Sequence, residues 1–511
     1  MGTAGPARTA PARPAVIACT GKVLQRPAGL IWLLIAGQIV TWTLAPALTH
    51  VVPPLDVVEG YMWGQERVIA TYKHPALPSW VLEMTRLLTG TVGWPAYLAS
   101  QLFVGASFFF VYRLGCDLMG RERAAAGTLL LTGILYYSWT TPEFNHNIVQ
   151  TTFWAGFAWA LWRAVDRQAL LWWVILAAFA SLAFYAKLST ALLLVAGGIW
   201  MLLDARGRAA FATYGPFLAL ALLAVAVAPL GSWLAETNFA MLRYAAERTS
   251  YATPKGIHEF VLGALGALAG FLPLLAAGLV RRPAAGGGGA GTLPAVDPRA
   301  LRFLLVLTGV PPALLIVAAL VTGTGLKAAW ASSMFNLTGL LAIAMSGARF
   351  HPRSLQRIAA VALGLVVAIP VAYAVFVSMP FRTGKPPLRV LWSGPEISAR
   401  MSAVWDQATG GAPLRIVAGE NWVAGLIALP LGDRPHLLSD VNLARSPWIS
   451  ARQLEDQGML VVWEERKAPI DMQPYINART EEWRFEKFTA PSSRIPIEIG
   501  YIVVPPRRVA R

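Results

Sequence analysis

The sequence predicts a polytopic α-helical membrane protein that carries a small α/β domain after its last membrane span. Three observations lead to this fold class. Of the 511 residues, 56% are hydrophobic and only 14% are charged, whereas soluble proteins carry about 25% charged residues. Apolar runs close to the ~20 residues that cross a bilayer recur throughout residues 28–379. The segment 380–511 has no such run and a mixed, more polar composition.

Eleven apolar segments are candidates for membrane-spanning helices. The stretch 171–203 is too long for one helix and has Lys187 at its middle, so we expect two helices joined by a tight outer turn there. Residues 1–27 then form a cytoplasmic tail, and 28–379 form the transmembrane domain. The expected spans are 28–48, 93–112, 124–140, 147–162, 169–186, 188–203, 211–231, 259–280, 302–321, 329–347 and 358–379.

The basic residues predict the orientation of these helices. Lys and Arg are enriched in the cytoplasmic loops of membrane proteins. With the N-terminus inside, the inner segments hold 18 basic residues and the outer loops hold eight. The odd number of helices then places 380–511 on the outer side. Most of the net charge of +16 is therefore an orientation signal, and a nucleic-acid partner is not expected.

The outer segment 380–511 predicts a small α/β domain. Short apolar runs that suit strands alternate with stretches that suit helices. The strand-like runs are Leu414–Ala418, Met459–Trp463 and Ile497–Val504, and the helix-like stretches are 396–408 and 420–430. On the inner side, the glycine-rich residues 283–298 predict a flexible linker.

The first outer loop, residues 51–86, is the most informative segment. Outside the tail, eight acidic residues fall on the outer side and five on the inner side, so we expect an active site outside. Asp56 sits where a helix cap is expected, and Glu59 follows three residues later on the same helical face. Catalytic carboxylates and a capping box without chemistry are both compatible with this spacing. Tyr61 and Trp63 suit a helix in the membrane interface and are candidates for acceptor or sugar binding.

Further polar residues lie at the expected outer membrane surface. The second outer turn contains Glu143, Asn145 and His146 between two apolar spans, and polar groups at this depth are costly unless they serve a function. Asn145 and His146 are candidates for acceptor or sugar binding. Glu59, Glu143 and His146 are also the candidate ligands of a divalent metal ion, although no cofactor is firmly indicated.

Cationic side chains form a second group of candidates. Lys73 and His74 precede Pro75, which favours an extended conformation before it. Lys187 and Lys327 fall on other outer turns. Cations at this level suit a lipid-linked phosphate, because charge-assisted hydrogen bonds are strong where the dielectric constant is low. For Lys187, snorkelling to the membrane interface is the alternative.

Four strings carry a resemblance to a known superfamily. LDVVEGYMWG (55–64), YKHPALPSW (72–80), TPEFNHN (141–147) and YAKLS (185–189) resemble motifs of the protein O-mannosyltransferase and aminoarabinose transferase superfamily. These are polytopic glycosyltransferases of the C-type fold. The resemblance implies transfer of a sugar from a polyprenyl-phosphate-linked donor to a lipid, glycan or protein acceptor. It places the enzyme, surrounded by membrane lipids, in a bacterial inner membrane with its C-terminal domain in the periplasm.

The resemblance also implies roles for the candidate residues. Asp56 matches the general base, Glu143 matches a second acid, and Lys73, His74 and Lys187 match groups that approach the carrier phosphate. In the mannosyltransferases the two acids of the first loop are adjacent, whereas two residues separate Asp56 and Glu59 here, so Glu59 stays the alternative base.

Another departure lies near the end of the match. Many relatives have a histidine before the tryptophan that Trp330 matches, and this chain has Ala329 there.

A secondary transporter or flippase for a lipid-linked or small anionic substrate is the alternative function, although transporters usually show internal repeats and ionisable residues at the membrane midplane.

Overall fold

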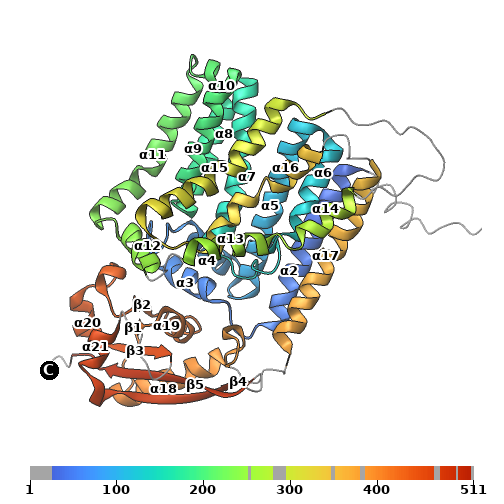
Figure 1. Cartoon of the computed structure of the whole chain (residues 1–511). Helices are drawn as coiled ribbons and strands as arrows, with labels where there is room; N and C mark the ends of the chain where they lie inside the picture. Colours follow the sequence, from blue (N-terminus) through green and yellow to red (C-terminus); the bar gives the residue numbers. More distant parts are fainter. Residues whose placement is uncertain are drawn as a thin grey trace, which may run out of the picture.

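The computed structural model describes residues 26–250, 255–279, 295–346, 352–379, 386–464, 472–490 and 493–507. The predicted cytoplasmic tail and most of the predicted linker 283–298 lie outside the described residues. A helical domain forms the larger part of the molecule, and the C-terminal domain lies against one end of it (Figure 1). The chain is a multi-pass membrane protein by the length and apolar character of its helices.

The helical domain contains helices of unequal length. Five of them are long and apolar enough to cross a membrane, and two bent pairs, α13 with α14 and η3 with α16, raise this number to seven among the described residues. The helices are α2 (Pro27–Thr49), α3 (Leu55–Gln65), α4 (Leu77–Thr89), α5 (Trp94–Met119), α6 (Arg121–Leu130), α7 (His146–Arg167), α8 (Leu170–Ala186), α9 (Thr190–Leu203), α10 (Ala205–Ala210), α11 (Gly215–Glu236), α12 (Ala240–Ser250), α13 (Lys255–Ala267), α14 (Phe271–Leu279), α15 (Pro298–Thr322), η3 (Ala328–Phe335), α16 (Thr338–Ser346) and α17 (Pro352–Ser378).

Every predicted span coincides with a helix or a broken helix, and the prediction of one continuous helix over 124–140 is wrong. There α6 ends at Leu130 and short 3-10 turns continue to Tyr137. A Cβ atom on Gly133 would lie 2.4 Å from the backbone of Gly270, which separates α13 from α14. Two helix breaks therefore pack directly on each other, and only glycine permits that approach. The count of eleven crossings stays a prediction.

The predicted α/β character of the C-terminal domain is confirmed. Its five-stranded sheet has the order β2-β1-β3-β5-β4. β1 is parallel to β2 and β3, and β5 is antiparallel to β3 and β4. β3 and β5 contain two of the predicted strand runs, and β1 covers the last three residues of the run Leu414–Ala418, whereas β2 and β4 are not among the predicted strands. The elements are α18 (Gly394–Thr409), β1 (Ile416–Gly419), α19 (Asn421–Ala428), β2 (His436–Ser439), α20 (Ala451–Gln457), β3 (Met459–Glu464), α21 (Gln473–Asn477), β4 (Arg484–Ala490) and β5 (Ser493–Val504).

Helix α3 lies between the two domains. Val57 and Tyr61 belong to the core of the helical domain, whereas Val58 and Met62 belong to the core of the C-terminal domain. A Cβ atom on Gly425 of α19 would lie 2.4 Å from Val58, so α19 approaches α3 closely. The residues of α3 from Val57 to Gly64 are buried in protein, and its place at the membrane interface stays a prediction.

Candidate active site

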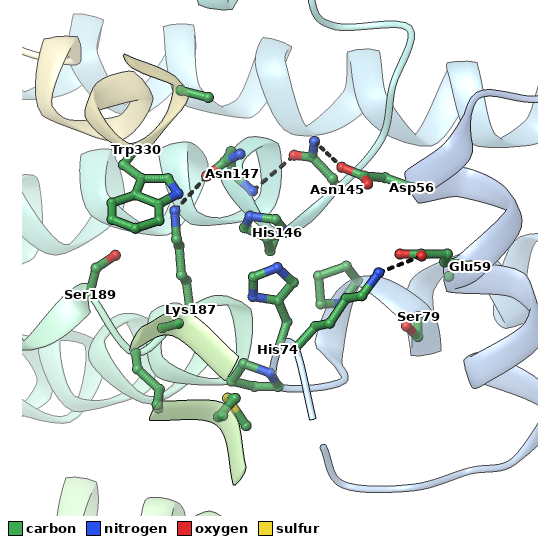
Figure 2. Close-up of a pocket in the computed structure, with 18 of the residues that line it drawn as sticks. Asp56, Glu59, His74, Ser79, Asn145, His146, Asn147, Lys187, Ser189 and Trp330 are labelled. Carbon is green, nitrogen blue, oxygen red and sulfur yellow. Dashed lines mark hydrogen bonds and ion pairs between the residues drawn. The ribbon is translucent and has the colours of Figure 1, made fainter. Parts of the chain in front are cut away.

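A cavity of about 480 Å³ lies at the junction of the first loop and the helical domain (Figure 2). The first loop here means residues 50–93, which join α2 to α5 and contain α3 and α4. Other walls come from the N-terminus of α7, the α8–α9 junction, α12 and η3. The polar and aromatic residues that line the cavity are Asp56, Glu59, Trp63, Lys73, His74, Ser79, Asn145, His146, Asn147, Lys187, Ser189, Tyr244, Lys327 and Trp330.

Asp56 lies in the first turn of α3 and faces the cavity. The capping residue of this helix is Pro54, and its end has no side-chain cap from within the helix. The capping-box alternative for Asp56 and Glu59 is therefore wrong. Glu143 takes the capping role instead, because its Oε1 accepts a hydrogen bond from the backbone N–H of Asp56 at 3.2 Å. The Asp56 carboxylate accepts a hydrogen bond from Asn145 Nδ2 at 2.9 Å (Figure 2).

The surroundings of Asp56 favour proton uptake. Burial and the neighbouring Glu59 carboxylate raise the pKa of the Asp56 carboxyl, although the hydrogen bond from Asn145 lowers it. Burial and the nearby Asp56 also raise the pKa of Glu143. A carboxyl whose pKa lies closer to neutral is a more effective general base than an ordinary aspartate, because it holds the accepted proton more strongly.

Glu59 and Lys73 form a buried ion pair at one side of the cavity. Lys73 Nζ lies 2.6 Å from Glu59 Oε1, and the side chains are 17% and 5% exposed. The rings of Trp63, Tyr72 and Tyr244 surround the ammonium group at 5.6, 5.7 and 5.9 Å. Burial lowers the pKa of Lys73, but the Glu59 carboxylate raises it more, so that it ends above its ordinary value. Lys73 is therefore held as a cation.

A second cation, Lys187, lies at the other side of the cavity (Figure 2). Its Nζ donates a hydrogen bond to Asn147 Oδ1 at 2.8 Å and lies 6.0 Å from the ring of Trp330. Lys187 is 9% exposed, and within the described residues no carboxylate forms an ion pair with it. Burial lowers the pKa of Lys187 to about 7, although the charge of Asp56 raises it, so a bound anion would keep this lysine protonated.

Two stacked histidines lie between the two lysines. The rings of His74 and His146 have centroids 3.6 Å apart and planes at 29°. Burial, together with the charges of Lys187 and Lys73, lowers the pKa of His74 well below its ordinary value. His74 is therefore neutral and supplies hydrogen-bonding nitrogens rather than charge.

The cavity collects nine of the eleven predicted site residues, and Tyr61 and Glu143 do not line it. Tyr61 is buried in the helical core, where its hydroxyl lies 3.1 Å from Thr85 Oγ1. Glu143 lines a separate opening of about 460 Å³ behind Asp56. Within the described ranges no three His, Cys, Asp or Glu side chains gather as metal ligands, so Glu59, Glu143 and His146 do not form such a set. A metal requirement stays a prediction.

Sequence reasoning missed two contributors to the site. Tyr244 of α12 packs its ring against Tyr72, with centroids 5.2 Å apart. Asn421 of the C-terminal domain donates a hydrogen bond to Glu59 Oε1 at 2.9 Å. Tyr244 lies in the predicted outer loop between the spans 211–231 and 259–280, but no motif marks it there, and Asn421 lies in the C-terminal domain, outside the polar strings at the predicted membrane surface.

Comparisons with known proteins agree with this fold. Residues 73–233 match the model of the dolichyl-phosphate-mannose-protein mannosyltransferase family. No curated protein matches the chain. The crystal structure of ArnT from Cupriavidus metallidurans bound to undecaprenyl phosphate shares 13% identity and a TM-score of 0.58, covering 93% of this chain and 98% of that one. Its apo state shares 14% identity and a TM-score of 0.59, covering 94% and 98%.

The structural match extends far beyond the family match. The family match includes residues 73–80 of the YKHPALPSW string and the whole of TPEFNHN and YAKLS, while the structural match extends over both domains. At such low identity the structural match shows a shared fold. The predicted resemblance is therefore confirmed: the chain is a membrane protein with the C-type glycosyltransferase fold, and the family match over residues 73–233 indicates a glycosyltransferase.

Proposed function

We propose that the protein transfers a sugar from a polyprenyl-phosphate-linked donor to a lipid, glycan or protein acceptor at the outer face of a bacterial inner membrane. The observation that carries this proposal is that a carboxylate and a lysine line opposite sides of one cavity. A half-buried carboxylate, Asp56, lies at one side, and a buried lysine without an ion-pair partner among the described residues, Lys187, lies at the other. Glycosyl transfer from a lipid phosphate needs both groups at once.

Lys187 is the proposed ligand of the donor phosphate. Negative charge accumulates on the phosphate as the bond from its oxygen to the anomeric carbon breaks, and a desolvated cation stabilises that charge. Lys327 lines the same cavity and is proposed to assist. The ArnT structure of the same fold is bound to undecaprenyl phosphate, which supports a donor of this class.

Asp56 is the proposed general base. The acceptor hydroxyl attacks the anomeric carbon as its proton passes to the Asp56 carboxylate, and the lipid phosphate leaves with the electron pair of the broken bond. We propose that this single displacement inverts the anomeric centre. Glu59 is less suited to the role, because its Oε1 already accepts from Lys73 and Asn421. Among the described residues, the Asp56 carboxylate has one side-chain hydrogen-bond partner, Asn145.

Complementation of a deletion strain tests the function. Mass spectrometry of envelope lipids, glycans and proteins from that strain should show a missing sugar, which the wild-type gene restores. Asp56→Asn should lower transfer by about 10²- to 10⁴-fold, the usual contribution of a general base, at equal membrane abundance. Glu66→Gln is the matched control, because Glu66 also belongs to the first loop but does not line the cavity. An unchanged envelope would overturn the function, and full activity of Asp56→Asn would overturn its role.

A further inference from the structure

The C-terminal domain contacts the cavity wall through one edge of its sheet. β1 ends at Gly419 and the parallel β2 ends at Ser439 in the same register. Asn421 follows β1, and Asp440 follows β2, so both lie at the carboxyl edge of the parallel strands. In open α/β sheets this edge is where ligands bind. In this protein the first loop covers that edge of the sheet, and Glu59 and Tyr72 of the loop accept hydrogen bonds from Asn421.

A buried chain of hydrogen bonds joins this edge to the site. Asn421 Nδ2 donates to Glu59 Oε1 at 2.9 Å and to the Tyr72 hydroxyl at 3.2 Å. The Tyr72 hydroxyl in turn donates to Asp440 Oδ2 at 3.2 Å. Asn421 and Glu59 are only 5% and 4% exposed. Both hydrogens of the Asn421 amide are used in these two bonds. The position of the Glu59 carboxylate therefore depends on a residue of the C-terminal domain.

The direction of the Asn421 amide is fixed by its neighbours. A carboxylate accepts hydrogen bonds and donates none, so the amide nitrogen must face Glu59. The amide oxygen, Oδ1, is then buried without a hydrogen-bond partner among the described residues. A buried unpaired oxygen lowers stability, and folding alone gives no reason to keep it. The arrangement therefore favours a role at the site.

The same carboxylate oxygen holds Lys73. Glu59 Oε1 accepts from Lys73 Nζ at 2.6 Å as well as from Asn421. Lys73 lines the cavity. We infer that Asn421 and Asp440 are positioning residues, through which the C-terminal domain fixes the Glu59–Lys73 pair for sugar transfer. The inference rests on the proposed function for its catalytic consequence, while the placement of the pair is measurable separately.

Asn421→Asp is the sharpest perturbation. It keeps the size of the side chain but places a carboxylate against Glu59, where an amide donated before. Turnover at saturating donor should fall by about 10- to 100-fold, since a buried hydrogen bond to a charged group is replaced by repulsion. The apparent KM for the donor should change little, because Lys187 belongs to another element. His436→Asn is the matched control, since His436 lies at the same domain interface and bonds to Glu66, outside the cavity.

Hydrogen exchange reports the placement without any transfer assay. In Asn421→Asp, amide exchange over residues 71–74 should accelerate by about 10-fold, because the local opening free energy falls with the lost bonds. Asn421→Ala removes the donor without adding a charge and should accelerate the same exchange by a smaller factor. That variant also keeps the test available if Asn421→Asp does not fold.

The outcomes separate the two proposals. If the wild-type protein transfers no sugar and Asn421→Asp still accelerates exchange at 71–74, the proposed function fails and the positioning stands. If turnover and exchange in Asn421→Asp match those in His436→Asn, the positioning role is overturned. Exchange at 71–74 in Asn421→Ala that equals the wild-type rate would also overturn it, because the lost bond to Glu59 would then have no effect on this segment.

Discussion

Replacing Lys187 with glutamine tests whether this lysine binds phosphate or merely snorkels to the membrane interface. Glutamine removes the charge and keeps an N–H donor for Asn147, which now receives a bond of 2.8 Å. A charge-assisted hydrogen bond contributes about 1.5–3 kcal/mol, and each ~1.4 kcal/mol changes a dissociation constant tenfold. We therefore expect the Kd for undecaprenyl phosphate to rise by about 10- to 150-fold.

Stability should respond in the opposite sense. Lys187 is buried and has no ion pair among the described residues, so removing its charge relieves a desolvation penalty. The thermal midpoint of unfolding without ligand should stay constant or rise. Undecaprenyl phosphate binding is measured by titration in detergent, and Arg206→Gln, at an exposed position remote in sequence from the cavity, is the charge-matched control. Unchanged affinity together with a lowered midpoint would refute the phosphate role and support snorkelling.

Two further predictions concern the domain interface and the helix breaks. The hydrogen bond to Glu66 raises the pKa of His436 in the folded protein, although burial lowers it. This bond therefore stabilises the folded state fully below the pKa of about 6.5 that the histidine has in the unfolded chain. The stabilisation is lost as the pH rises through the higher pKa of the folded protein. Thermal unfolding followed between pH 5 and 9 should show this loss in the wild type and not in His436→Asn. Gly133→Ala should lower stability by about 1–3 kcal/mol, because its Cβ would clash with Gly270, whereas Gly364→Ala, with open space around it, should not. Equal effects of the two alanines would refute the close packing of the breaks.

Most of the fold was predictable because membrane insertion leaves strong local signals. Every predicted span corresponds to a helix or a broken helix, since a segment in lipid must be apolar over its whole length. Helix breaks leave no such signal. The break near Gly133 packs against Gly270, which lies 137 positions later. The apolar composition of a segment does not show whether its helix is continuous or broken.

The site was predictable where polar residues gather at an unusual place. Asp56, Asn145 and Lys187 lie between apolar spans, where polar groups are costly and therefore conspicuous. Asn421 gave no such signal, because it lies in an ordinary helix of a polar domain and meets Glu59 across 362 positions. A residue of this kind becomes visible only when the two domains are packed together.

The three carboxylates show what the sequence leaves undecided. Asp56, Glu59 and Glu143 are all expected near the outer membrane surface, and their spacing in the sequence does not assign them different catalytic roles. The structure gives each a different partner: Asn145 for Asp56, Lys73 for Glu59, and the backbone of α3 for Glu143. Asp56 is the proposed base, while Glu59 is bonded to a cation and Glu143 holds the backbone of α3. The proposed role of each carboxylate thus depends on the hydrogen bonds and ion pairs that its neighbours make, and these cannot be inferred from a short stretch of sequence.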